Sequence, residues 1–178
     1  MASHLTLILG GARSGKSQRA EQLAAQEKRP VHFLPTFNPA LCPNDPAMAE
    51  RLELHRARRP ASWITNEPAN SNLAETIEHL GNSLILIDCL TLWLSGILAT
   101  QPAESAMSHI ENLCRTLEKS PAQIFCVSNE LGLAPIPSNA LARSFRDLHG
   151  TMNQHVARIA HTDEWVLAGI PVRIKPAR

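Results

Sequence analysis

The chain has 178 residues, of which 44% are hydrophobic and 19% charged, and its 17 Lys and Arg against 16 Asp and Glu leave a net charge of +1. This length and composition suit one substantial hydrophobic core, so we expect a single domain over residues 1–178. The near-neutral charge gives no electrostatic argument for binding nucleic acid or a membrane surface. Polar residues interrupt every long apolar stretch and the four cysteines form no CxxC pair, which predicts a cytoplasmic protein without stable membrane insertion.

Apolar runs typical of buried strands recur along the chain. Each is rich in Leu, Ile or Val, and they cover residues 5–9, 31–34, 84–88, 124–128 and 165–168. Most are apolar on both alternating faces, as are strands of a parallel sheet that is covered on both sides. The segments between them are long enough for helices, so the pattern predicts an α/β fold with a doubly wound, mainly parallel sheet.

Helical periodicity appears in most of the connecting segments. The clearest helices are predicted at residues 17–28, 73–80, 107–117 and 141–159. Gly81 follows the second of these and suits a left-handed C-terminal cap. A shorter helix is predicted over residues 45–59, with Asp45 as N-cap and Pro46 at its first position, because Pro60 disfavours helical geometry in the residue before it.

A glycine-rich motif connects the first predicted strand to the first predicted helix. Its sequence GGARSGKS satisfies GxxxxGK[ST] and consists of Gly10, Gly11, Ala12, Arg13, Ser14, Gly15, Lys16 and Ser17. In such a loop, backbone N–H groups surround a phosphate, the lysine reaches the β- and γ-phosphates, and the hydroxyl can bind Mg²⁺. The alternative is a glycine-rich turn with an incidental lysine, and the strand-to-helix context argues against it.

A carboxylate stands where a nucleotide site needs one. Asp88 ends the apolar run of residues 84–87, at the sheet edge expected to face the glycine-rich loop. This is a Walker B arrangement, in which the carboxylate holds Mg²⁺ or its waters. The alternative interpretation is that Asp88 caps the helix that begins near Thr91, and both roles can coexist.

Basic residues share one face of the predicted helix over residues 45–59. Arg51, His55 and Arg58 or Arg59 follow helical spacing. Guanidinium groups near an imidazole lower its pKa, and the neutral imidazole is a nucleophile for phosphorus. The alternative is a solvated basic face with an incidental histidine. A regulatory GTPase of the Ras type should carry a guanine-reading NKxD signature and a DxxG switch. At the corresponding strand ends the sequence offers only SNE at residues 128–130 and DCLT at residues 88–91, which disfavours that class.

Five segments together resemble one family. They are the loop GGARSGKS, RLELHRARRPASW at residues 51–63, LIDCLT at 86–91, VSNE at 127–130, and LARSFRD at 141–147 with Gly150, Asn153 and Gln154. In order and over nearly the whole chain they resemble the bifunctional adenosylcobinamide kinase / adenosylcobinamide-phosphate guanylyltransferase family. The phosphate loop alone is shared by many kinases, but its combination with HRxRRPxxW and FRDxxGxxNQ is specific.

The resemblance implies a phosphate-loop, RecA-like fold and two reactions. GTP or ATP phosphorylates adenosylcobinamide, and GMP from GTP is then transferred to the product, through a guanylylated histidine at His55. It also implies Mg²⁺ at Ser17 and Asp88, a homotrimer, and nucleotide contacts by the phosphate loop with Pro35, Thr36, Phe37, Arg56, Ala57, Arg58, Arg59, Glu67 and Asp88. A plain small-molecule kinase and a nucleotide-dependent switch are the alternative functions. We also expect residues 35–60 to close on bound nucleotide, because a proline-rich loop precedes the basic helix.

Overall fold

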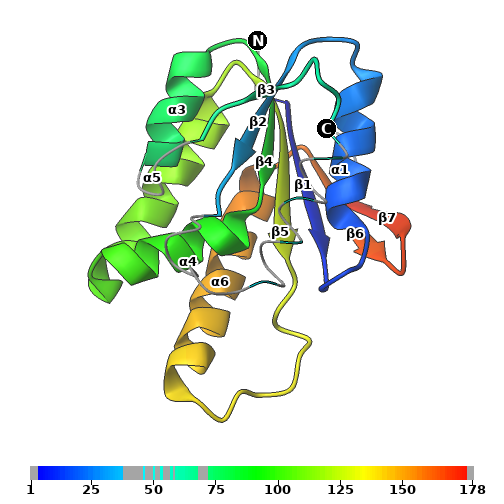
Figure 1. The fold of residues 1–178 in the computed structure, drawn as a ribbon. Helices are drawn as coiled ribbons and strands as arrows, with labels where there is room; N and C mark the ends of the chain where they lie inside the picture. Colours follow the sequence, from blue (N-terminus) through cyan, green and yellow to red (C-terminus); the bar gives the residue numbers. More distant parts are fainter. Residues whose placement is uncertain are drawn as a thin grey trace.

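The computed structural model describes residues 4–37, 46, 50, 53, 57, 59–67 and 72–175. Its strands form one seven-stranded sheet in the order β3-β2-β4-β5-β1-β6-β7 (Figure 1). The strands are β1 His4–Gly10, β2 Val31–Pro35, β3 Ile64–Thr65, β4 Leu84–Asp88, β5 Gln123–Asn129, β6 Thr162–Leu167 and β7 Ile170–Lys175. Every neighbouring pair is parallel except β6 and β7, which are antiparallel. The predicted α/β class with a mainly parallel sheet is confirmed.

Helices cover both faces of this sheet. The described helices are α1 Lys16–Gln26, α3 Leu73–Leu80, α4 Leu90–Thr100, the short 3₁₀ helix η3 Ala103–Ser105, α5 Ala106–Lys119 and α6 Ala140–Ile159. Figure 1 shows α1 on one side of the sheet and α3, α4, α5 and α6 on the other. Two hydrophobic cores result, a larger one under the four helices and a smaller one under α1.

Strand residues alternate between these two cores. In β4, Ile85 and Ile87 belong to the larger core, whereas Leu84 and Leu86 belong to the core under α1. The period of two residues therefore directs the next side chain, Asp88, to the α1 side of the sheet. This alternation positions the candidate site, because the carboxyl ends of β1, β4 and β5 meet at the edge where α1 begins.

The structure contains elements that the strand and helix patterns did not predict. A helix near Thr91 was considered only as the element that Asp88 would cap, and it is present as α4. This helix is buried at Leu90, Trp93 and Leu94, among others, so its polar face is too narrow to give a helical period. The strand β7 is an exposed edge strand that pairs with β6 across a tight turn, in which Ala168 has φ 49° and Gly169 has φ 82°. The strand β3 has only two residues, too few for a strand pattern.

Two local predictions have mixed outcomes. Gly81 does follow α3 and has a positive φ of 54°, but its ψ of −132° lies outside the left-handed helical region, so the predicted cap geometry is wrong. Within the predicted helix over residues 45–59, the described residues Pro46, Glu50, Glu53 and Ala57 are helical and exposed. Its proposed N-cap, Asp45, lies outside the described residues.

Candidate functional site

The glycine-rich motif forms the turn between β1 and α1. Gly10 is the last residue of β1, and a Cβ atom there would lie 2.4 Å from Ser14 Oγ and 2.8 Å from the Val166 carbonyl oxygen. Such contacts are too short for any side chain, so the turn requires glycine at position 10. Gly15 precedes α1 with φ 94° and has no side chain to cap the first turn. The N–H groups that begin α1 are thus available to an anion, at the positive end of the helix dipole.

Hydrogen bonds hold the turn in shape. The Ser14 N–H donates to the Gly11 carbonyl at 3.3 Å, and the Gly169 N–H of the β6–β7 turn donates to the Ser14 carbonyl at 2.8 Å. Lys16 Nζ donates to the Gly11 carbonyl at 3.2 Å, so the ammonium group lies across the loop. This is the place from which a lysine can reach the outer phosphates of a nucleotide.

Asp88 ends β4 at the same edge of the sheet. Its backbone carbonyl accepts a hydrogen bond from the Thr36 N–H at 3.3 Å, and Thr36 Oγ1 donates to the Cys89 carbonyl at 2.5 Å. Pro35 is paired in register with Asp88, so the end of β2 lies beside the end of β4. The N-cap of α4 is Cys89, without a side-chain hydrogen bond, and the structure therefore does not support Asp88 as that cap.

The pKa of the Cys89 thiol depends on the charged groups at this edge of the sheet. Burial and, more weakly, the negative charge of Asp88 raise this pKa to about 11, whereas the positive charge of Lys16 opposes this rise. Both charged groups therefore act electrostatically on one buried atom. The carboxylate and the ammonium group are brought to the same end of the sheet, as the sequence predicts.

A buried polar network supports the end of β5, and sequence reasoning did not single it out. Asn129 is paired in register with Gly10, and its N–H donates to Thr91 Oγ1 at 3.0 Å while its carbonyl accepts from Asn153 Nδ2 at 2.9 Å. Phe125 and Val127 of β5 face the α1 core, so alternation directs the Asn129 side chain to that side too. The available signal was a run of polar residues that directly follows an apolar strand.

His149 stands at the centre of this network. Its Nε2 atom lies 3.0 Å from Thr91 Oγ1 and 3.3 Å from Ser128 Oγ, and Ser128 Oγ donates to Asn153 Oδ1 at 2.7 Å. The ring is fully buried, and burial lowers its pKa to about 4. The imidazole is therefore neutral near pH 7 and serves as a hydrogen-bonding spacer between α6, α4 and β5.

The predicted basic segment is described only in part. The guanidinium carbon of Arg59 lies 3.7 Å from the centroid of the Phe33 ring. The Trp63 ring stacks on the same Phe33 ring, with 6.4 Å between the ring centroids. Arg59 is thus held over the α1 side of β2. Ala57 is exposed, and Glu67 is exposed beyond β3. The predicted residues His55, Arg56 and Arg58 lie outside the described part of the chain.

The remaining predicted residues lie on or near the phosphate loop. Ala12 and Arg13 are exposed, Ser17 is half-buried in the first turn of α1, and Phe37 is half-buried after β2. In the described ranges, no group of three or more His, Cys, Asp or Glu residues could hold a metal ion. The Ser17 hydroxyl and the Asp88 carboxylate are oxygen donors of the kind that Mg²⁺ takes beside phosphate and water, so these residues would fit such an ion. Nor does any described helix have the length and apolar character needed to span a membrane.

The sheet order and the loop define the class of protein. With β5 between β1 and β4, a glycine-dependent loop before α1 and an acidic end to β4, this is a phosphate-loop nucleotide-binding fold. A protein of Pyrococcus horikoshii OT3 is similar in fold, with a TM-score of 0.61 at 8% identity over 99% of this chain and 88% of that chain. A KaiC-like protein from the same source has a TM-score of 0.50 at 13% identity, over 91% and 70%.

Sequence comparison identifies the family. The model of the family described as cobinamide kinase / cobinamide phosphate guanyltransferase matches residues 6–174. The bifunctional adenosylcobalamin biosynthesis protein CobP of Pseudomonas aeruginosa is 39% identical over 95% of this chain and 96% of its own, and CobU of Escherichia coli K12 is 34% identical over 96% and 99%. The chain therefore belongs to this family of cobalamin biosynthesis, and it is an enzyme of the transferase class.

Proposed function

We propose that the chain catalyses two successive transfers at one nucleotide site. In the first, the aminopropanol hydroxyl of adenosylcobinamide attacks the γ-phosphorus of GTP or ATP, loses its proton, and releases the nucleoside diphosphate. In the second, a ring nitrogen of His55 attacks the α-phosphorus of GTP and pyrophosphate leaves. A phosphate oxygen of the phosphorylated acceptor then attacks the guanylyl phosphorus, which frees His55 and gives adenosylcobinamide-GDP.

The observation that carries this proposal is the loop from Gly10 to Ser17. A site that tolerates no side chain at Gly10 and leaves the start of α1 uncapped suits a chain of phosphates. Lys16 would neutralise the outer phosphates, and Ser17 and Asp88 would hold Mg²⁺, which supplies further charge neutralisation when bound. Family membership supports both reactions.

Other contacts of the proposed nucleotide site come from the segment after β2 and from the basic segment. They are Pro35, Thr36, Phe37, Arg56, Ala57, Arg58, Arg59 and Glu67. The register of Pro35 with Asp88 and the cation–π contact of Arg59 with Phe33 support this assignment for the described members. The homotrimer stays a prediction, and sedimentation equilibrium tests it by measuring the mass of the assembly.

Incubation with GTP labelled at the α-phosphate tests the mechanism. We expect an acid-labile, alkali-stable label on the protein, and we expect none on His55→Ala, because a phosphoramidate has this stability and needs the imidazole. His79→Ala, an exposed histidine on α3, is the matched control and should keep the label. Turnover of adenosylcobinamide without a label on the protein would support the alternative of a plain small-molecule kinase. Nucleotide binding without any turnover would support the alternative of a nucleotide-dependent switch.

A further inference from the structure

The first half of α6 extends beyond the sheet. Its buried residues, His149, Met152, Asn153 and Val156, all lie in the second half, whereas Leu141 in its first turn is 76% exposed. Figure 1 shows this first half, with the loop of residues 130–139 that leads into it, projecting past the carboxyl ends of the strands. The helix and the loop thus form a ledge beside the edge of the sheet at which the phosphate loop lies.

A groove of about 480 Å³ separates the helix from the loop. The loop contributes Gly132, Ala134 and Ile136, and one face of α6 contributes Arg146, Asp147, Gly150, Thr151 and Gln154. The groove begins close to the phosphate loop, because the Glu130 N–H donates to the Gly10 carbonyl at 3.0 Å and Gly132 follows two residues later. Two residues span at most about 7 Å.

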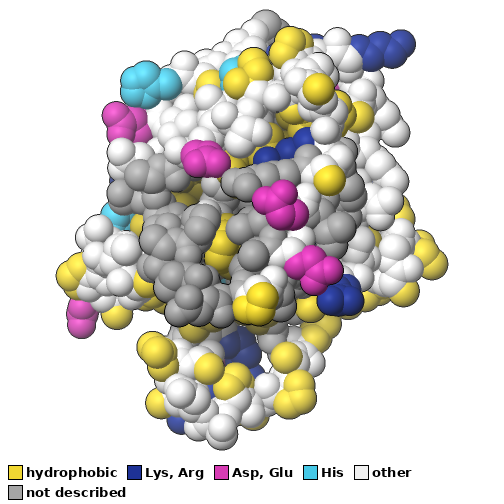
Figure 2. Space-filling model, in the orientation of Figure 1, with side chains coloured by type: hydrophobic (Ala, Val, Ile, Leu, Met, Phe, Trp, Pro, Cys, Tyr) yellow, Lys and Arg dark blue, Asp and Glu magenta, His cyan; other side chains and the backbone are white. Residues whose placement is uncertain are grey.

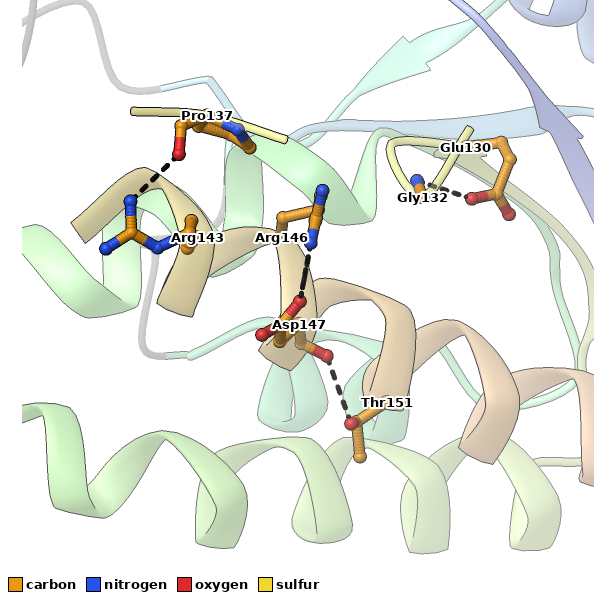
Figure 3. Close-up of polar contacts among 7 residues, drawn as sticks. All are labelled: Glu130, Gly132, Pro137, Arg143, Arg146, Asp147 and Thr151. Carbon is orange, nitrogen blue, oxygen red and sulfur yellow. Dashed lines mark hydrogen bonds and ion pairs between the residues drawn. The ribbon is translucent and has the colours of Figure 1, made fainter. Parts of the chain in front are cut away.

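The walls of the groove are held by hydrogen bonds within the chain. Glu130 Oε1 accepts from the Gly132 N–H at 2.8 Å, and Arg143 Nη1 donates to the Pro137 carbonyl at 2.9 Å (Figure 3). Arg143 Nη1 also donates to the Ser138 carbonyl at 2.6 Å. Arg143 therefore ties the loop to α6. A groove whose two sides are fixed in this way is preformed for a ligand.

Gly150 points to a ligand rather than to internal packing. It lies in the interior of α6 with an ordinary helical backbone, and a Cβ atom there would meet nothing within 4 Å. Glycine weakens the interior of a helix relative to alanine, so the chain gains nothing from it by itself. Gly150 lines the groove, and the missing side chain leaves that space open.

Arg146 supplies a cation to the same groove. Its side chain is 20% exposed, and the acceptor recorded for it among the described residues is Asp147 Oδ1, at 3.4 and 3.5 Å. These are long contacts to a carboxylate that is itself 72% exposed, and a guanidinium has five N–H donors. The planar donor pairs of Arg146 suit a bidentate phosphate.

Exposed apolar side chains lie on the same loop and helix, and one of them, Ile136, lines the groove. Leu133, Ile136 and Leu141 are 73%, 75% and 76% exposed, on the loop and on the first turn of α6. In Figure 2, hydrophobic side chains are spread over the lower part of the molecule, with Lys and Arg between them. The ledge therefore combines a cation in a groove with an apolar rim, a pattern complementary to an amphipathic anion.

We propose that this groove is the acceptor subsite, and that it takes an amphipathic phosphomonoester. Arg146 binds the phosphate, the backbone at Gly150 admits the chain that carries it, and the apolar rim contacts the bulky remainder. This assignment rests on the proposed function, whose second transfer uses a phosphorylated acceptor at the neighbouring nucleotide site. Arg146 and Gly150 would thereby determine acceptor affinity without touching the nucleotide.

Steady-state transfer of guanylyl groups to the phosphorylated acceptor tests the groove. For Gly150→Ala we expect a melting temperature raised by ~1–4 °C together with an acceptor KM raised at least severalfold, a combination that a merely structural residue would not give. For Arg146→Gln we expect the KM of the phosphorylated acceptor in guanylyl transfer to rise about tenfold, and the KM of the unphosphorylated acceptor in the phosphorylation reaction to change far less. Arg115→Gln, an exposed arginine on α5, is the charge-matched control.

Two further measurements separate the outcomes. Equilibrium dialysis measures the affinity of the unlabelled protein for the phosphorylated acceptor, and this binding does not require guanylylation of His55. Loss of protein labelling and loss of acceptor binding are therefore independent results. An unchanged acceptor KM and unchanged dialysis in both variants would overturn the subsite. A second result would also overturn it: Leu141→Ser changes the mass measured by sedimentation while acceptor binding stays normal. That result would assign the ledge to contact with a second copy of the chain.

Discussion

Arg19 of α1 and Glu164 of β6 form an ion pair with two hydrogen bonds. Arg19 Nε lies 2.8 Å from Glu164 Oε2, and Arg19 Nη2 lies 3.0 Å from Glu164 Oε1. The carboxylate is nearly fully buried, and the Arg19 hydrogen bond, aided by weaker contributions from Arg173, lowers the pKa of Glu164 despite burial. The pair joins the first turns of α1, which follows the phosphate loop, to β6, which pairs with β1.

Truncating this pair should destabilise the fold measurably. In Arg19→Ala the Glu164 carboxylate stays buried with only the long contact to Arg173, at 3.5 Å, so we expect the free energy of unfolding to fall by about 1–3 kcal/mol. Urea denaturation at pH 7 measures it. Arg173→Ala is the control, because that side chain is 58% exposed and should cost much less. Equal losses in the two variants would contradict this view of the pair.

The same pair predicts an acid-dependent stability. The pKa of Glu164 is lower in the folded chain than its ordinary value of 4.5, so the stabilisation is complete above that value and is lost as pH falls through the folded pKa. The gap in stability between the wild-type chain and Arg19→Ala should therefore narrow below pH 4.5. Urea titrations at several acidic pH values measure the gap. If the difference in stability between the two chains stayed constant below pH 4.5, ionised Glu164 would be excluded as its cause.

Adjacent glycines of the phosphate loop should differ sharply. A Cβ at Gly10 meets the Val166 carbonyl at 2.8 Å, a backbone atom that can move only with β6, whereas a Cβ at Gly11 meets nothing within 4 Å. Gly10→Ala should therefore lower nucleotide affinity by at least tenfold and lower stability, through overpacking that costs about 1–3 kcal/mol. Gly11→Ala should retain the wild-type fold. Isothermal titration with GTP and thermal unfolding compare them, and the reverse order of effects would refute the proposed loop geometry.

Sequence reasoning succeeded where a local pattern carried the information. The loop GGARSGKS and the acidic end of β4 each consist of consecutive residues that a local pattern can identify. Parallel strands place their carboxyl ends at the same edge of the sheet, so the two segments meet there. The predicted convergence of Lys16 and Asp88 was therefore available from the chain alone. The same holds for α5 and α6, whose apolar residues follow a helical period over several turns.

Sequence reasoning failed where tertiary contacts decide. Nothing next to His149 in the sequence indicates Thr91 or Ser128, which are its partners only because α4, α6 and β5 meet at the sheet edge. Arg143 and Asp147 have the spacing of a helical ion pair, yet Arg143 donates to the Pro137 and Ser138 carbonyls. Backbone carbonyls just before the helix thus take the guanidinium group that the spacing alone would pair with Asp147.

His149 should give the chain a stability that depends on mildly acidic pH. Burial lowers the pKa of its imidazole from 6.5 to about 4, so the unfolded chain binds a proton in this range while the folded chain does not. Stability is complete above pH 6.5 and declines as pH falls toward 4, by up to about 3 kcal/mol from this group. Urea unfolding of the wild-type chain at pH 5, 6 and 7 should show the decline.

Substitution separates this histidine from the others. His149→Asn should reduce the dependence on pH between 7 and 5, although the variant loses stability at every pH because Thr91 and Ser128 lose their shared partner. His79→Gln, at an exposed position on α3, should keep the wild-type dependence. A wild-type pH profile in His149→Asn would assign the effect to another group.

Lys16 should be required for both transfers. Its ammonium group donates to the neutral Gly11 carbonyl of its own loop, at 3.2 Å. Contacts with charged phosphate oxygens are stronger than such a hydrogen bond to a neutral carbonyl, which is worth about 1 kcal/mol net, so a bound nucleotide favours moving the ammonium group onto its phosphates. Because both proposed reactions use a triphosphate at this loop, Lys16→Ala should lower kcat/KM by ~10²–10³ in each, as expected for the loss of one charge-stabilising donor. Phosphorylation and guanylyl transfer are assayed separately for this comparison. Lys28→Ala, at an exposed position two residues after the end of α1, is the control. If one transfer survived in Lys16→Ala at the wild-type rate, the two reactions could not share the site.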